Sequence, residues 1–454
     1  MMRRLVVFLA TACLCLSLSA ADLQTGYFSR DYTFSYKLNP AFNPGYRFVA
    51  PPLIGLTSAS YQSDLGLGNL LYPRNGELVT FLHPDITAEE FLKPLNKKFN
   101  RISVDASTNI FAIGIKSGRL YNTIDVSLRA SVDASVPYDM FRFLKTGTAE
   151  TNTYDLSGLR VQASSFVECG FGSSFKTGDL TIGTRLKGLI GLADFNASLD
   201  RMKVRFDGQQ WSVSAVGNLT AAYDGIKVKT TDSMAGHYPD IIDFGSSKYS
   251  FKLGVSGVGV AADFGLKYEH EGLELSASLS DIGVMWWFNN VRGYTNNSWT
   301  FEGREDIPVN GDGGSIGDEI AETYDELIEV FQFRKKSSRD EFRMLSFTTR
   351  LGARYRLAAP LSVGLMGSYR YSPVISVIEG RASLDYNPFR FLEIIGSCGM
   401  GTYGLSAGAM LNVRVPWVTL TLGADNLMVS KFSPQGIPID KFNGCFTVGL
   451  AVRW

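Results

Sequence analysis

The last ten residues of the chain alternate strictly between apolar side chains and small or polar ones. The apolar parity is Phe446, Val448, Leu450, Val452 and the terminal Trp454. A β-strand points successive side chains to opposite faces, so this segment predicts a strand with one continuous apolar face that ends in an aromatic ring. Soluble sheets alternate in the same way, so this segment alone leaves an edge strand of a soluble sandwich open.

A longer alternating run extends from Tyr121 to Val136. One parity is mostly aliphatic, whereas the other includes Asp125, Arg129 and Asp133. Burying these charges unpaired in an apolar core would cost several kcal/mol. The run therefore predicts a strand with one apolar face and one face toward a wet interior.

Two further charged residues lie in an alternating run. Arg185 and Lys187 share a parity with Gly183 and Leu189, so both are expected to face water or a lumen. They could form half of an internal charge ladder with Asp125 and Asp133, and the solvent-facing end of a strand is the competing interpretation. Gly183, Gly188 and Gly191 leave room for a lumen element to approach or for the strand to bend.

The N-terminus predicts export. Arg3 and Arg4 precede an apolar stretch from Leu5 to Leu18, and Ser19-Ala20-Ala21 offers a small-x-small cleavage site. We interpret residues 1–21 as a cleaved signal peptide, because the stretch is shorter than the roughly 20 residues that a membrane-spanning helix needs. The mature chain then begins at residue 22.

Composition narrows the class of protein. Hydrophobic residues make up 45% and charged residues 19% of the sequence, and the mature chain has no apolar run long enough for a membrane helix. A strand protein can span lipid only as a closed barrel, because lipid offers no water to the backbone groups of an open edge. The formal net charge is zero, so nothing favours nucleic acid as a partner.

Short turns between the alternating runs predict an all-β, antiparallel, up-and-down transmembrane barrel of about 14 strands over residues 22–454. Ser198 to Phe206 with Trp211 to Tyr223 could be a membrane pair or an extracellular hairpin. Thr87, three residues before Glu90, is a capping box that opens a short helix.

Two segments break the alternation. Residues 22–45 contain no clear strand and are expected to enter or cap the lumen. In the long loop 302–341, Ile316 to Phe331 has apolar residues at helical spacing among acidic ones. This predicts an acidic helix that is either a gate or a loop helix packed on the barrel rim.

Aromatic and sulfur-containing residues add two expectations. Trp286, Trp287 and Trp454 are expected to form an aromatic girdle at the membrane boundary. Cys169, Cys398 and Cys445 remain after the signal peptide, and their wide spacing fits small strand residues better than a zinc site, with one disulfide left open.

Four strings carry a resemblance to a known family. They are Asn39-Pro40-Ala41, the segment Thr181 to Gly191, the segment Leu279 to Trp286, and the segment Gly423 to Leu427. Together they resemble a Bacteroidota outer-membrane family of unknown function, related to FadL-like and PorV-like barrels. The terminal strand likewise resembles the segment that the barrel-assembly machinery recognises. The resemblance implies a roughly fourteen-stranded barrel in the outer membrane, surrounded by its lipid, whose N-terminal segment caps the lumen.

The leading functional hypothesis is a channel or transporter for hydrophobic or amphipathic small molecules. The alternative is a PorV-like barrel that binds a secreted protein and supports secretion or surface assembly. The sequence offers no catalytic constellation, because His83, His237 and His270 are far apart and no nucleophile motif accompanies them. We therefore expect no enzyme activity, no cofactor and no metal site.

Overall fold

The computed structural model describes residues 23–66, 69–74, 77–147, 152–207, 210–233, 236–250, 252, 254–301, 325–326, 329–330, 332–428 and 443–454. The predicted signal peptide lies outside these residues, as does most of the predicted helix Ile316 to Phe331. Among the described residues, no helix combines the length and apolar character that crossing a membrane requires.

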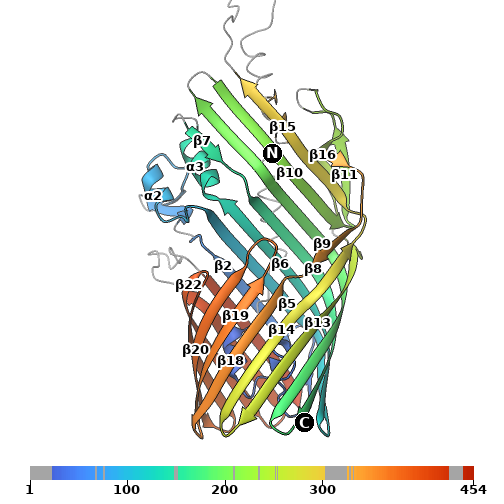
Figure 1. The fold of residues 1–454 in the computed structure, drawn as a ribbon, viewed down its shortest axis with the longest axis vertical. Helices are drawn as coiled ribbons and strands as arrows, with labels where there is room; N and C mark the ends of the chain where they lie inside the picture. Colours follow the sequence, from blue (N-terminus) through green and yellow to red (C-terminus); the bar gives the residue numbers. More distant parts are fainter. Residues whose placement is uncertain are drawn as a thin grey trace, which may run out of the picture.

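Fourteen antiparallel strands form one closed barrel, which confirms the predicted fold class (Figure 1). The ring closes because β2 pairs with both β5 and β24. Around the ring the strands are β2 (Leu56–Ser63), β5 (Phe99–Ser117), β6 (Leu120–Pro137), β8 (Leu159–Thr177), β9 (Leu180–Asp207), β13 (Gly257–His270), β14 (Leu273–Trp287), β18 (Phe347–Ala358), β19 (Leu361–Tyr371), β20 (Val377–Phe389), β21 (Leu392–Gly401), β22 (Gly404–Val415), β23 (Val418–Met428) and β24 (Asn443–Arg453).

Short strands continue two members of the ring. β1 (Phe48–Ala50) precedes β2 and pairs with the same two neighbours, and β17 (Glu341–Met344) precedes β18 and pairs with β14. Closure leaves the ring without an open edge, so its backbone donors and acceptors bond between strands rather than to solvent.

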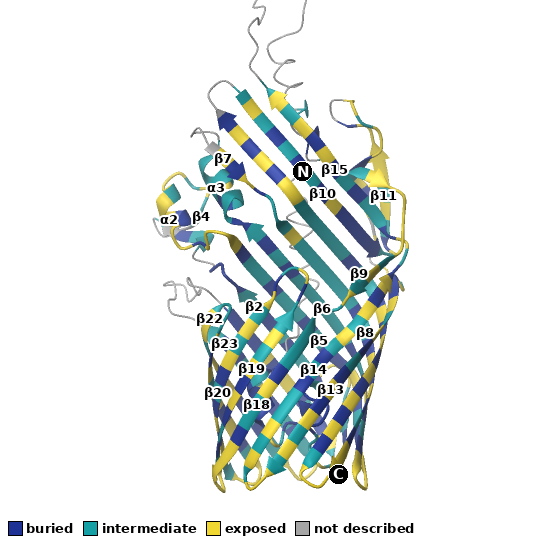
Figure 2. Ribbon diagram, in the orientation of Figure 1, coloured by how far each residue is buried: buried dark blue, intermediate teal, exposed yellow. Residues whose placement is uncertain are grey.

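Side chains alternate between the two faces of the wall. On β18, Leu351 points outward and is 62% exposed, whereas its neighbour Arg350 points inward and is 1% exposed. The alternation is visible as banding along the barrel strands (Figure 2). The result is an oily exterior around an interior that carries charge.

The two ends of the barrel differ. At one end, hereafter the short-turn end, hairpins turn within a few residues, and Gly118 and Gly178 adopt φ of +59° and +57° there. These backbone angles favour glycine, as the tight turns require. The C-terminus lies at this end (Figure 1).

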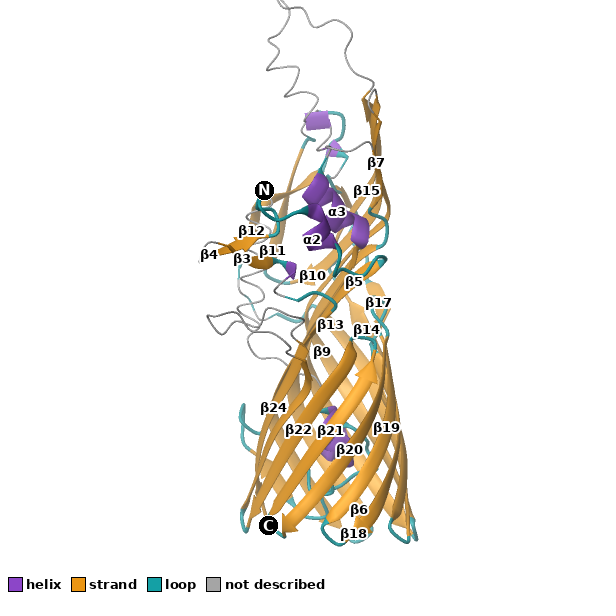
Figure 3. Cartoon of the chain, turned by 90° about the vertical axis from the view of Figure 1, so that its left-hand side faces the viewer, coloured by secondary structure: helices purple, strands orange, loops and turns teal. Residues whose placement is uncertain are grey.

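At the other end, the wall rises beyond the closed ring on one side of the barrel (Figures 1 and 3). This extension sheet consists of β7 (Asn152–Asp155), the upper part of β9, β10 (Gln210–Tyr223), β15 (Val291–Phe301) and β16 (Arg334–Lys336). β9 alone has 28 residues, which corresponds to roughly 90 Å of strand. The predicted segment Ser198 to Phe206 is therefore the upper part of β9, and β10 belongs to the extension rather than to the ring.

The extension sheet packs one face against α3 (Tyr138–Thr146). Tyr154, Val204 and Val213 lie in this core with partly buried Phe143 of α3. β11 (Ile226–Thr231) and β12 (Ile241–Tyr249) attach at the side of β16. A second small core holds α2 (Ala88–Leu92) beside the hairpin of β3 (Leu71–Arg74) and β4 (Glu77–Thr80).

The short helix predicted after Thr87 is confirmed as α2, whereas the Glu90 carboxylate pairs with Arg74 and does not complete a capping box. Thr87 is the N-cap, and its Oγ1 accepts a hydrogen bond of 3.1 Å from the Glu90 backbone N–H.

The exterior face generates a stability prediction. Leu365 lies mid-strand in β19 and is 65% exposed on the outer face. Leu365→Arg is expected to lower the free energy of unfolding in lipid by about 2–4 kcal/mol, because a charge at mid-membrane is poorly solvated. Trp417→Arg, in the turn between β22 and β23, is the control and is expected to cost about 0–1 kcal/mol. Denaturant unfolding in vesicles measures both, and equal costs would contradict a membrane-embedded β19.

Candidate functional site

The N-terminal segment fills the short-turn half of the lumen. Residues 23–46 run inside the ring with two short 3-10 turns, Gln24–Phe28 and Ser35–Lys37 (Figure 3). We call this segment the plug. It packs an aromatic core against inward wall residues, among them Phe48, Met366 and Met410. The plug members of that core are Leu23, Tyr27, Phe28, Tyr32, Phe34, Tyr36, Leu38 and Phe42.

Polar contacts anchor the plug to several wall strands. Lys37 Nζ lies 2.9 Å from Asp125 on β6. Asp31 pairs with Arg414 on β22, and the Thr25 backbone N–H donates to Asp425 on β23 at 2.9 Å. One anchor lies on β6 and the other two lie on the neighbouring strands β22 and β23, so the folded wall holds the plug from two sides.

Glycines in the wall allow the plug backbone to approach. A Cβ at Gly183 would lie 2.2 Å from the carbonyl of Pro40, and one at Gly364 would lie 2.3 Å from the Phe28 ring. Asn39 of the plug donates to the carbonyl of Ala277 at 3.2 Å. Gly183 thus allows the close approach of a lumen element, whereas a Cβ at Gly188 would meet only open space and one at Gly191 would meet Trp287.

The charges singled out from the sequence meet beside the plug. Arg185 Nη2 lies 2.7 Å from Asp125 and 2.6 Å from Glu168, and Arg129 Nη1 lies 2.9 Å from Glu168. Lys187 Nζ lies 2.6 Å from Asp281. With Asp263 and Lys37 these residues form what we call the wall cluster, which contains four cations and four anions.

Burial makes this balance necessary. The side chain of Arg185 is 2% exposed, and Asp125 and Asp263 are each 0% exposed. An unpaired charge at such depth would cost several kcal/mol, whereas each charge here has at least one opposite partner. The cluster joins the plug to strands β6, β8, β9, β13 and β14.

Asp133 lies elsewhere. Its Oδ1 accepts from Ser103, its Oδ2 accepts from Ser372, and Arg370 lies 3.9 Å away. Arg370 also binds Asp105 at 2.7 Å. Asp133 therefore belongs to a separate group above the plug, not to the ladder with Arg185 and Lys187.

Sequence reasoning missed Glu168, Asp263 and Asp281 as lumen groups. Asp263 sits in a bulge where the register of β13 and β14 shifts, and it accepts the Asp281 backbone N–H at 2.7 Å. Asp281 has a φ of +66° at this bulge. The signal available was a single acid within the otherwise apolar run from Gly257 to Leu266.

Above the plug the lumen contains a cavity of about 150 Å³. Gln24 of the plug contributes to its lining, and Arg350 donates to the Gln24 side chain at 3.2 Å. Most lining side chains are polar or charged, and a smaller apolar part comes from Phe166, Met285 and Trp287. This chamber can contact a molecule that has both a charged and an apolar part.

The predicted aromatic girdle needs one correction. Trp286 is 41% exposed and stacks on Phe342 with ring centroids 5.9 Å apart, and Trp454 is 54% exposed. Trp287, however, is 2% exposed and packs inside the barrel, so its assignment to the girdle was wrong. Consecutive strand residues face opposite sides, and only one of the two tryptophans can face lipid.

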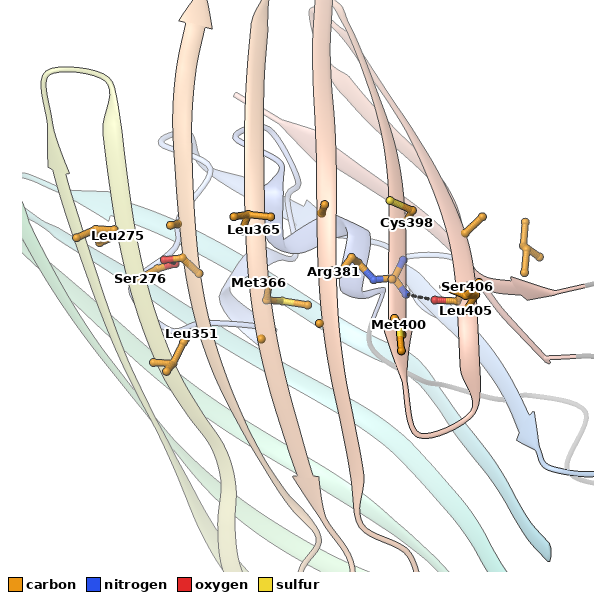
Figure 4. A pocket seen from close by; sticks show the side chains of 18 residues that line it. Leu275, Ser276, Leu351, Leu365, Met366, Arg381, Cys398, Met400, Leu405 and Ser406 are labelled. Carbon is orange, nitrogen blue, oxygen red and sulfur yellow. Dashed lines mark hydrogen bonds between the residues drawn. The ribbon is translucent and has the colours of Figure 1, made fainter. Parts of the chain in front are cut away.

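The outer wall carries an apolar depression (Figure 4). Small residues such as Gly367 and Gly380 form its floor, and Leu351, Leu365 and Met400 border it. Its lining extends from β14 through β18–β22 to β23, and acyl chains would fill it in a bilayer. Cys398 lies at this depression, and all three described cysteines have free thiols.

Among the described residues, no group of three or more His, Cys, Asp and Glu side chains is arranged to hold a metal ion. His237 Nδ1 lies 2.8 Å from Glu329 and His270 Nδ1 lies 2.8 Å from Asp179, at separate surface positions.

The fold and the filled lumen define a plugged fourteen-stranded transmembrane barrel. The chain belongs to the family of unknown function DUF5723, whose model matches residues 40–425. No curated protein matches the chain.

Several solved barrels are similar over nearly their whole length. The toluene transporter TbuX of Ralstonia pickettii has 8% identity and a TM-score of 0.40, covering 96% of this chain and 94% of that one. A FadL homologue of Pseudomonas aeruginosa has 9% identity and a TM-score of 0.43, covering 96% and 99%. The toluene transporter TodX of P. putida has 8% identity and a TM-score of 0.38, covering 91% of each chain. At these values the function has to be argued from the residues of this chain.

The wall cluster generates a second prediction. Arg185→Met is expected to destabilise the barrel by about 3–5 kcal/mol, because it leaves Asp125, Glu168 and Asp263 with too few partners. Lys176→Met, which removes an exposed pair with Glu269, is the control and is expected to cost about 0–1 kcal/mol. Unfolding in urea followed by tryptophan fluorescence measures the difference. A cost for Arg185→Met no larger than that of the control would refute the pairing.

Proposed function

We propose that the protein is an outer-membrane channel for small amphipathic molecules, with the plug as its gate. The observation that supports this most directly is the plug itself, which occupies the bore and is anchored by side-chain contacts rather than by strand pairing. Such contacts can be exchanged for contacts with water or substrate without opening the ring. The short-turn end would face the periplasm and the extension sheet the exterior, as in other barrels of this kind.

The lining of the chamber supports an amphipathic cargo. Arg370, Arg350 and Asp105 offer charge and hydrogen bonds, while Phe166 and Met285 offer a limited apolar surface. A purely apolar molecule would displace the water that is hydrogen-bonded to these charged groups and would offer them no hydrogen bonds in return. Its binding would therefore be weaker. A molecule with a polar head and a short apolar part fits the surroundings better.

A single substitution tests the gate. Gly364→Leu places a side chain where the Phe28 ring lies, so it should push the plug away from the wall. We expect a severalfold rise in single-channel conductance in planar bilayers. Gly367→Leu is the matched control on the same strand, because Gly367 faces outward with nothing within 4 Å of its Cβ position. Equal conductance of the two variants would argue against a gate at this place.

Removal of the plug is the second test. Deletion of residues 23–45 is expected to open the bore and accelerate liposome swelling by small solutes. Heat-modifiable gel mobility would verify that the shortened chain still forms a barrel. A folded barrel that is as impermeable as the full chain would count against the proposal.

A further inference from the structure

A second cavity lies where the extension sheet meets the ring. It has a volume of about 200 Å³, and we call it the rim pocket. Four strands of the extension and β17 supply its polar lining. These side chains are Asn196, Ser198, Asn218, Thr220, Arg292, Lys336, Glu341 and Arg343.

The strand register places the rim pocket on the lumen side of the wall. Gln162, which lines the chamber above the plug, is paired with Asn196, and Asn196 is paired with Thr220. Thr220 is in turn paired with Arg292. Directly opposite residues in antiparallel strands share a face, so Arg292 lies on the face that lines the lumen. Arg343 borders both cavities.

Two cations stand directly opposite one another in this pocket. Arg292 on β15 is paired with Lys336 on β16. Like charges in this arrangement destabilise a sheet unless an anion compensates them. Glu341 lies 3.4 Å from Arg292 and 2.8 Å from Arg343, so one carboxylate is shared between two guanidinium groups.

Lys336 is the cation in excess. Its Nζ lies 4.8 Å from the centre of the Tyr294 ring, and the described residues provide no carboxylate within ion-pair distance of it. Asp194 pairs with Arg343, and the exposed Asp200 accepts a hydrogen bond of 3.3 Å from Asn218 of the pocket. The ion-pair partners of Arg292 and Arg343 are therefore Glu341 and Asp194, and neither carboxylate lies within ion-pair distance of Lys336. Arg292 Nε is buried, and its contact with Glu341 at 3.4 Å is an ion pair without a hydrogen bond.

The sheet above the pocket is also basic. Lys203 is paired with Ser214, which has the same parity on β10 as Asn218 of the pocket. Arg201 and Arg205 share the parity of Lys203, and all three are exposed. Among the described residues of this face, Asp155 of β7 is paired with Lys203. Such a surface raises the local concentration of anions at the mouth of the lumen.

We propose that the rim pocket binds the oxyanion group, a carboxylate, phosphate or sulfate, of a small soluble molecule entering the lumen. Arg292 and Lys336 supply the charge, while the hydroxyl groups of Ser198 and Thr220 can donate hydrogen bonds to the remaining oxygens. The pocket can hold such a group, because its volume of about 200 Å³ is several times the roughly 30 Å³ that one water molecule takes in the liquid. The proposal rests on the proposed function in that the ligand is the head group of the transported molecule.

Direct binding tests the proposal. The full-length protein in nanodiscs of neutral lipid is titrated with sodium phosphate, sulfate or acetate by calorimetry, with chloride holding the ionic strength constant. We expect a dissociation constant on the order of 1 mM for at least one oxyanion. Lys336→Gln should weaken binding about tenfold or more, by loss of a charge-assisted hydrogen bond. Lys227→Gln, an exposed cation on β11, should leave binding unchanged.

Three outcomes would overturn the proposal: no oxyanion binding above chloride, equal binding by wild type and Lys336→Gln, or loss of phosphate binding when anionic lipid replaces neutral lipid. The last outcome would assign the pocket to a lipid head group. Conductance of the Gly364→Leu variant separates this inference from the gate. If the protein binds phosphate but Gly364→Leu does not raise the conductance, only the proposed gate is refuted. If Gly364→Leu raises the conductance but no oxyanion binds, only the proposed role of the rim pocket is refuted.

Discussion

The need to satisfy backbone hydrogen bonds in lipid governs the rest of this structure. A sheet in a membrane cannot leave an edge open, so β2 has to pair with β24 as well as with β5. Once the ring closes, the strand period of two assigns every side chain either to lipid or to the bore. The outer set is apolar and the inner set is charged. The bore then needs partners for its charges, and the plug supplies one of them with Lys37.

The period of two is also why much of the molecule could be predicted from its sequence. Parity alone assigned Asp125 to the face toward a wet interior, and it predicted the apolar face of β24. For Arg185 and Lys187 it left two positions open, the lumen and the solvent-facing end of a strand. Parity does not reveal which inward residues meet, because that depends on the order of strands and on the space between them. Arg185 reaches Asp125 across β8, where Gly170 and Gly172 leave room for the guanidinium group. Asp133, further along the same strand as Asp125, lies too high to join them.

The predictions from sequence that the structure corrects failed for local reasons. Trp287 was assigned to the girdle because three aromatic residues follow one another, although neighbours in a strand cannot share a face. The length of β9 was missed because register shifts next to Ser165 and Val216 change the parity of the pattern without ending the strand. The rim pocket was not predicted at all, since Arg292 and Lys336 are brought opposite one another only by the pairing of β15 with β16.

The pairing of β2 with β24 has a consequence for biogenesis. The strand that seals the cylinder comes from one terminus and its partner from the other, and the Thr25 anchor to Asp425 spans 400 positions of the polypeptide. Sealing must therefore wait until the whole polypeptide has been delivered to the membrane. Residues 23–46 immediately precede β1, and their anchors Asp125 and Asp425 lie on strands that are far apart in the sequence. The complete docking surface for this segment therefore exists only once both ends of the polypeptide have come together in the cylinder.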